Sequence, residues 1–132
     1  MKYFTIEELT RSTTATTRGI DNTPAEAVKK SLQYLTENLL DPIRARFGAP
    51  ITINSGYRSP ALNAAVGGAA TSQHIKGEAV DITAGSRGSN RDLFELLLNS
   101  GLEFDQLIDE SDYSWVHVSL KESGNRKQVL KL

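Results

Sequence analysis

The sequence predicts an α+β fold in which a largely antiparallel sheet packs against helices. An early stretch has the spacing of a long amphipathic helix, and several later stretches alternate like strands, two of them joined by a short polar turn. With 132 residues, 39% of them hydrophobic, the chain can bury one sizeable core but not two. We therefore assign residues 1–132 to a single domain, with an N-terminal accessory helix and loop at 1–23 and the core at 24–132.

The helices of the first half are predicted from capping residues and hydrophobic spacing. The stretch TIEEL offers a capping threonine and acidic first-turn residues, so it predicts a short helix, and the threonine-rich stretch after it predicts a surface loop. Residues 24–47 predict one amphipathic helix that begins at an N-cap, Thr23, and ends at Gly48. Its hydrophobic residues recur at three- and four-residue steps: Val28, Leu32, Leu35, Leu39 and Ile43.

The remaining elements are shorter. Further helices are predicted at 59–66 and from about Ser89 onward. Alternation predicts strands at 51–53, 78–83, 104–109, 115–120 and 128–132.

The composition restricts the partners and the metal ligands that this chain can have. The formal charge of −1, from 15 basic and 16 acidic residues, favours neither nucleic acid nor a membrane surface as a partner. The chain has no cysteine, which excludes disulfides and thiolate ligands, so any metal must be held by histidine and carboxylate side chains. The N-terminus lacks the apolar stretch of a signal peptide or membrane span. We expect a monomer that is made in the cytoplasm and does not insert into a membrane.

The two histidines of the chain, with Asp81, are the candidate metal ligands. Alternation places His117 on the strand face opposite Val116 and Val118, and places Asp81 on the face opposite its hydrophobic neighbours. His74 precedes Asp81 by seven residues, and the intervening glycine permits a sharp turn back over the strand.

Two imidazoles and one carboxylate leave a fourth position for water, which is typical of a catalytic zinc site rather than a structural one. The residues alone leave a second interpretation open. Each histidine could be a partly buried residue with satisfied hydrogen bonds, and Asp81 could cap a turn.

The stretch from Asn54 to Thr83, followed by FDQLIDE and SWVHVSL, resembles the M15 zinc peptidases of the D-alanyl-D-alanine carboxypeptidase type. The shared pattern is Ser-x-His-x-x-Gly-x-Ala-x-Asp, followed by Trp-x-His. The resemblance implies one zinc ion held by His74, Asp81 and His117, a peptidoglycan stem-peptide substrate, and the hedgehog/DD-peptidase-like fold with the zinc site on the face of the sheet.

The same resemblance implies further site residues. Arg58, in Gly-Tyr-Arg-Ser, corresponds to an arginine that binds a substrate carbonyl or carboxylate and stabilises developing negative charge. Ser72 either donates a hydrogen bond to substrate or shapes the loop. We also assign Gln73 and Trp115 to substrate binding.

The general base is assigned by a second resemblance. Many M15 relatives carry an acidic residue three positions before the last histidine, where this chain has Ser114. Glu110 resembles instead the glutamate of the related hedgehog-type domains, and we assign it as the base, with Asp112 as the alternative.

We therefore expect a zinc metallopeptidase that acts on the cell wall, either as a D-Ala-D-Ala carboxypeptidase or as an L-Ala-D-Glu endopeptidase. A phage-type lysin, reaching its substrate after lysis or as part of a phage particle, fits a short chain without a signal peptide. The alternative is a non-catalytic zinc domain that binds cell wall or a protein partner.

Overall fold

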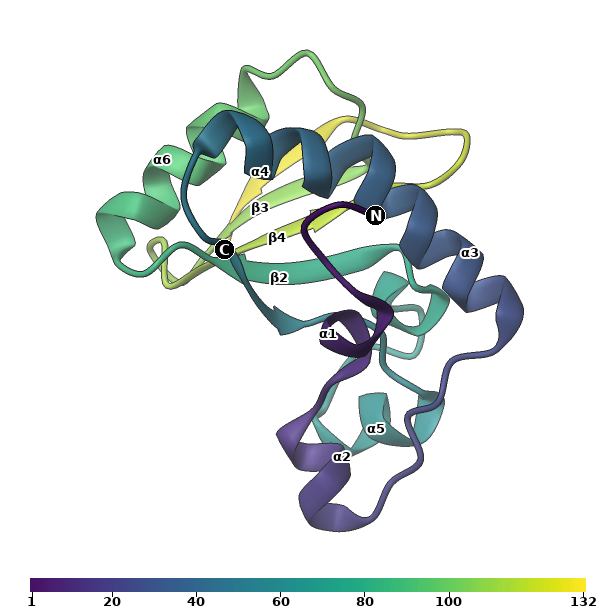
Figure 1. Cartoon of the computed structure of the whole chain (residues 1–132). Helices are drawn as coiled ribbons and strands as arrows, with labels where there is room; N and C mark the ends of the chain where they lie inside the picture. Colours follow the sequence, from purple (N-terminus) through teal and green to yellow (C-terminus); the bar gives the residue numbers. More distant parts are fainter.

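One five-stranded sheet, in the order β1-β2-β4-β3-β5, forms the centre of the fold (Figure 1). The structure is a computed structural model that describes residues 1–132. The pairs β1–β2, β2–β4 and β3–β4 are antiparallel, and β5 pairs with β3 in parallel. This confirms the predicted α+β class and largely antiparallel sheet. The strands are β1 Thr52–Ser55, β2 Ala79–Thr83, β3 Gln106–Glu110, β4 Trp115–Ser119 and β5 Gln128–Lys131.

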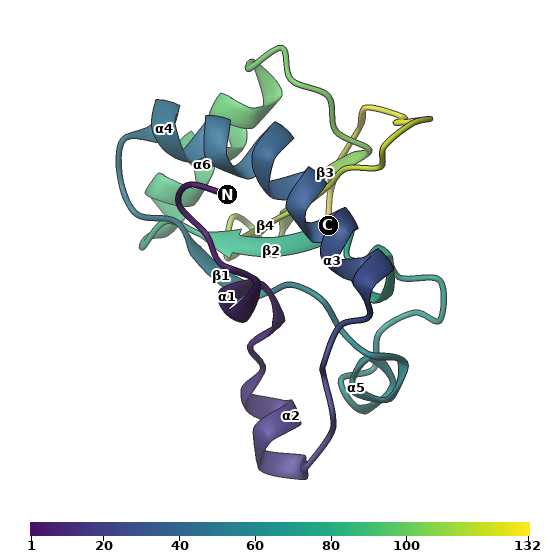
Figure 2. The same cartoon turned by 45° about the vertical axis from the view of Figure 1, so that its right-hand side comes forward.

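The helices leave one face of the sheet open. Figures 1 and 2 both show α3, α4 and α6 together over one face, α1 beside β1, and α2 and α5 beyond the sheet. The hydrophobic core lies under the first group and includes the strand residues Val80, Ile82, Leu107, Val116 and Val118. The helices are α1 Ile6–Thr10, α2 Thr13–Arg18, α3 Glu26–Leu35, π-helix η1 Thr36–Leu40, α4 Asp41–Phe47, α5 Pro60–Ala65, 3-10 helix η2 Gln73–Lys76 and α6 Arg87–Leu98.

The predicted helix at 24–47 is confirmed as α3, η1 and α4, which follow one another without a break. Its end is also confirmed, because Gly48 is left-handed with φ 71°. The predicted N-cap is wrong: the cap position is Ala25, and it makes no side-chain capping bond. The π-helical turn comes just before Pro42, whose ring cannot donate the usual hydrogen bond or tolerate the regular position of the preceding turn.

Thr13–Arg18, within the threonine-rich stretch, form the helix α2, so the prediction of a loop is wrong for these residues. Two capping signals outweigh the weak helix propensity of threonine: the Ser12 hydroxyl accepts a bond from the Ala15 N–H, and Gly19 ends α2 in a left-handed conformation. The helix before it is confirmed, with Thr5 as its N-cap. Phe4 and Leu9 from this N-terminal part belong to the main hydrophobic core.

The other predicted helices and strands are present within two residues of their expected ends. No helix combines the length and apolar character needed to cross a bilayer.

The N-terminal segment is fastened to the loop after β1. The Asn22 side chain donates to the carbonyls of Thr10 and Tyr57 and accepts from the Ser59 N–H. Beside it, Tyr57 N–H donates to the Leu9 carbonyl at 2.7 Å. A Cβ at Gly56 would lie 2.1 Å from that same Leu9 oxygen, so only glycine fits there.

We expect Gly56→Ala to lower the free energy of unfolding by about 2 kcal/mol or more, because the added methyl group must displace backbone. Urea unfolding measures this. Gly88→Ala is the matched control: its Cβ would meet only the Ser86 hydroxyl at 3.9 Å within α6, so it should be neutral or stabilising by up to about 1 kcal/mol. Equal effects of the two substitutions would contradict the steric explanation.

A buried carboxylate fastens the C-terminal strand. Asp105 is 0% exposed and accepts three hydrogen bonds from Arg126, from Nε, Nη2 and the backbone N–H. The hydrogen bonds from Arg126 outweigh burial and lower the pKa of Asp105 to about 2. Two residues after Arg126, Gln128 donates its N–H to the Asp105 carbonyl and begins β5.

Because the pKa of Asp105 is lower in the folded chain than in the unfolded chain, this carboxylate stabilises the fold above about pH 4, and the effect disappears as the pH falls toward 2. We expect Asp105→Asn to cost on the order of 1 to 2 kcal/mol at pH 7, since water screens the half-exposed Arg126. The stability difference between wild type and variant should shrink between pH 4 and pH 2. Denaturant unfolding across this pH range measures it, with the exposed Glu103→Gln as control.

Candidate metal centre

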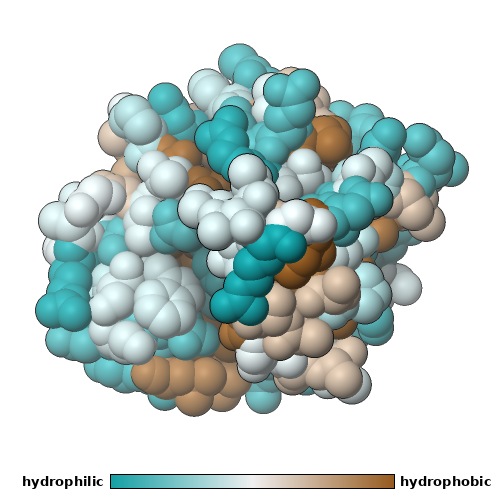
Figure 3. Space-filling view, turned by 90° about the horizontal axis from the view of Figure 1, so that it is seen from below, coloured by the Kyte–Doolittle hydropathy of each residue, from teal (hydrophilic) through white to brown (hydrophobic).

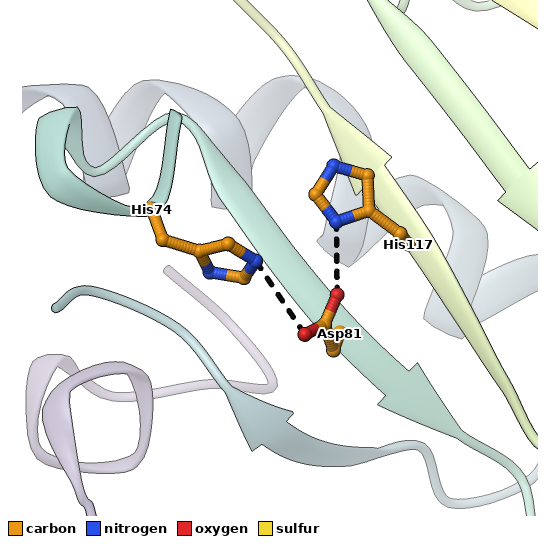
Figure 4. A group of neighbouring side chains, drawn as sticks. All are labelled: His74, Asp81 and His117. Atoms are coloured by element: carbon orange, nitrogen blue, oxygen red, sulfur yellow. Dashed lines mark hydrogen bonds and ion pairs between the residues drawn. The ribbon is translucent and has the colours of Figure 1, made fainter. Parts of the chain in front are cut away.

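Strand register brings two of the three predicted ligands together. Asp81 in β2 and His117 in β4 are directly paired across the sheet, on the face that the helices leave open. The third, His74 in η2, folds over this pair (Figure 4). One nitrogen from each histidine and one carboxylate oxygen lie within 4.8 Å of one another, so the group could hold a metal ion.

His74 is held in one orientation by backbone. It is 4% exposed, and its Nδ1 lies 2.7 Å from the Gly56 carbonyl oxygen. A carbonyl oxygen can only accept, so Nδ1 donates this hydrogen bond and Nε2 is the ring nitrogen that faces the other predicted ligands. That Nε2 lies 3.4 Å from Asp81 Oδ2. The loop is shaped for this by Ser72, whose hydroxyl accepts from the His74 N–H, and by left-handed Gly77, where a Cβ would lie 2.9 Å from the Val28 carbonyl oxygen.

Asp81 is the electrostatic centre of the group. Its Oδ1 lies 2.9 Å from His117 Nδ1, and Oδ2 lies 3.6 Å from Arg58 Nη2. Burial alone would raise the pKa of Asp81, but the hydrogen bonds from His117 and His74 outweigh it and lower the pKa below its ordinary value. The side chain is therefore a carboxylate at neutral pH, the form that binds metal.

Arg58 is positioned beside the carboxylate by two further contacts. Its Nε donates to the Ser55 hydroxyl and its Nη1 donates to Asn63 Oδ1. The side chain is 17% exposed, and it also lines a groove on the β1 side of the centre. Its guanidinium therefore links the predicted ligands to that groove.

A second groove lies on the β3 side and contains both His117 and Glu110. Ile108 is paired with His117, and Glu110 lies two residues further along β3, so alternation brings it to the same face. Asp112, the alternative base, is exposed in the left-handed turn after β3 and does not line this groove. Of the two acidic candidates, only Glu110 shares a groove with a predicted ligand.

Of the other residues predicted for the site, some line the His117 groove and some do not. Ser72 and Gln73 line the His117 groove, and Ser72 also caps η2. Trp115 is paired with Glu110 across the hairpin but does not line the groove. The hydroxyl of Ser114, which stands where many relatives have an acidic residue, donates to the Ser111 carbonyl and accepts from Nη2 of Arg87 in α6.

Sequence reasoning missed several residues that build the site. Ser55 and Asn63 orient Arg58, and Arg126 lines the His117 groove. The five-residue spacing from Arg58 to Asn63 across a Ser-Pro helix start was a usable signal. Arg126 had none, because it reaches the groove from the connection between β4 and β5.

The donor set fits a zinc ion. Two neutral imidazole nitrogens and one carboxylate oxygen are ligands that zinc favours, and three protein ligands leave a position for water or substrate. The hydrogen bond from His74 Nδ1 to the Gly56 carbonyl is also typical of metal-binding histidines, whose ring nitrogen that does not bind the metal usually donates to a carbonyl or carboxylate.

Two comparisons with known proteins concern the chain that carries this group. The family model described as Peptidase M15 matches residues 2–119. A zinc D-Ala-D-Ala carboxypeptidase of Streptomyces albus G is 54% identical over 39 residues, which cover 30% of this chain and 15% of that protein. The family match includes every strand of the sheet except β5, together with all three residues of the histidine–aspartate group. This chain belongs to the M15 family of peptidases.

Proposed function

We propose that this protein is a zinc-dependent peptidase that hydrolyses peptide bonds in the stem peptides of bacterial peptidoglycan. The observation that carries the proposal is the group His74, Asp81 and His117, whose ligand atoms lie within 4.8 Å of one another beside a groove that contains Glu110. The family match and the partial match to a zinc D-Ala-D-Ala carboxypeptidase support the metal and the substrate class.

Zinc bound by this group supplies a Lewis acid that polarises a carbonyl and lowers the pKa of a coordinated water. His74 would hold the ion through Nε2, since its Nδ1 donates to the Gly56 carbonyl. His117 presents Nδ1 and Asp81 presents its carboxylate oxygens to the same space.

Glu110 moves the proton. Water adds to the carbonyl carbon, Glu110 accepts the proton that this water releases, and the carbon–nitrogen bond then breaks as Glu110 gives a proton to the leaving amine. Arg58 stabilises the negative charge that develops on the carbonyl oxygen or binds a substrate carboxylate. Its contacts to Ser55 and Asn63 hold the guanidinium in place and so reduce the reorganisation that charge stabilisation would otherwise require.

The two candidate bonds differ in their products. A carboxypeptidase releases D-alanine, and an L-Ala-D-Glu endopeptidase leaves a new amine within the stem peptide, as expected for a lysin. Incubating purified peptidoglycan with the protein, with and without a chelator, and identifying the products by mass separates these activities. A protein that binds zinc and cell wall but releases no product would instead be the non-catalytic zinc domain. Ser114, at a position where many relatives have an acidic residue, favours this alternative. The presence of Glu110 in the same groove as His117 argues against it.

Removing a ligand should remove the metal. We expect His117→Ala to lose the zinc that the wild type retains after dialysis, at about one ion per chain, because two remaining ligands bind zinc weakly. Zinc content by elemental analysis measures this. Asp92→Ala removes an exposed carboxylate of α6 and should keep full zinc content. Undiminished zinc in the His117 variant would exclude the proposed ligand set.

Glu110→Gln should keep zinc but lower kcat by about 10²–10⁴-fold, because the amide cannot accept the proton. Steady-state hydrolysis of a stem peptide measures this. Asp112→Asn is the matched control, since it removes a carboxylate in the adjacent turn that does not line the groove. Full activity of Glu110→Gln, with activity lost in Asp112→Asn, would transfer the role of base to Asp112.

A further inference from the structure

The threonine-rich segment lines part of the groove on the β1 side of the metal centre. Arg11, Ser12, Thr13 and Thr14 form one wall, and Arg58 lies in the same groove. In Figure 1 this region lies at the bottom of the molecule, where α2 and α5 extend beyond the sheet. The function proposed above uses Arg58 but gives no role to the segment around α2.

Arg58 connects this groove to the metal centre. Its Nη2 lies 3.6 Å from Asp81 Oδ2, and its side chain also lines the groove. The His117 groove lies toward β3, on the other side of the Asp81–His117 pair. A peptide bound at the centre can therefore extend toward α2 as well as toward Glu110.

The groove has a net positive charge. Arg11 and Arg58 are its charged residues, and no acidic side chain lines it. Arg58 forms an ion pair with Asp81. Arg11, by contrast, is exposed and takes part in none of the ion pairs of the molecule. An unpaired guanidinium beside a groove without carboxylates favours an anionic ligand.

The rest of the lining fits a carboxylate carried by a peptide. The hydroxyls of Ser12, Thr13 and Thr14 add hydrogen-bonding groups, and Ile53, Leu62 and Val66 add apolar contacts for an aliphatic stem. Seen from below, this side of the molecule mixes hydrophilic and near-neutral residues with several hydrophobic groups (Figure 3). The groove itself, with its arginines and hydroxyl groups, is suited to a polar ligand.

The segment is held rigidly enough to select a ligand. Ala15 is buried, Ser12 caps α2, and Asn22 ties the Thr10 carbonyl to the loop that carries Arg58. The backbone that carries Arg11 is thus tied by hydrogen bonds to the loop that carries Arg58.

We infer that this groove binds a carboxylate of the peptide substrate beside the scissile bond, and that Arg11 is the residue that determines this specificity. The inference rests on the proposed peptidase function and deepens it by naming the substrate class: stem peptides with a free carboxylate next to the bond that is cut, in preference to the same peptides with that carboxylate amidated.

The test uses the zinc-loaded protein and two synthetic stem peptides that differ only in this carboxylate, free in one and a carboxamide in the other. Wild type should prefer the acid by about tenfold or more in kcat/KM. Arg11→Gln should bring the acid-to-amide ratio close to one, and Arg11→Lys should recover part of it. Arg18→Gln, an exposed arginine of α2 outside the groove, should keep the wild-type ratio.

A wild-type ratio near one, or a ratio that survives Arg11→Gln in protein with an unchanged circular dichroism spectrum, would overturn the inference. If neither peptide is cleaved, the proposed function fails. The inference is still tested, because titration calorimetry of the same peptides on the same variants gives the acid-to-amide ratio of Kd. That ratio should depend on Arg11 in the same way.

Discussion

The pairing of β2 with β4 is the constraint on which the site depends. Asp81 faces His117 because Val80 faces Val118 on the opposite side of the same two strands. A slip of one residue would turn the valines out of the core and both polar side chains into it. The free energy of burying the core therefore also fixes the strand positions of two predicted ligands, whose side chains then meet in a direct hydrogen bond.

The third ligand depends on backbone packing instead. His74 is oriented by the carbonyl of Gly56, and Gly56 itself lies against the backbone of Leu9 in α1. The N-terminal helix, the loop after β1 and η2 are thus three layers in contact. Gly56 contacts both the backbone of Leu9 and the ring of His74, so a displacement of Leu9 would shift the imidazole. The stability of the N-terminal segment and the orientation of His74 are therefore coupled.

The sequence predicted the features that follow a repeating pattern and missed features that depend on single contacts, whether local caps or long-range partners. Strand alternation gave the faces of Asp81 and His117 correctly, because a period of two is a local property. The α2 helix was missed because threonine has weak helix propensity, and here the caps Ser12 and Gly19 outweigh it. Arg126 could not be predicted, since its place depends on Asp105, a partner 21 residues away. The roles assigned to Glu110 and Arg58 stay predictions until variants are measured.

The residues proposed for the chemistry and the residues that form the groove walls lie on different parts of the fold. Two of the three predicted ligands and the proposed base lie on strands, where registers shared with the core restrict their movement. The groove walls come from α2, from the loop after β1 and from the connection before β5, which can vary without disturbing that register. We infer that selection among peptides depends on these wall residues, with Arg11 the main one. Changes in the threonine-rich segment should then alter which peptide is cut while the chemistry at Asp81 and His117 stays the same.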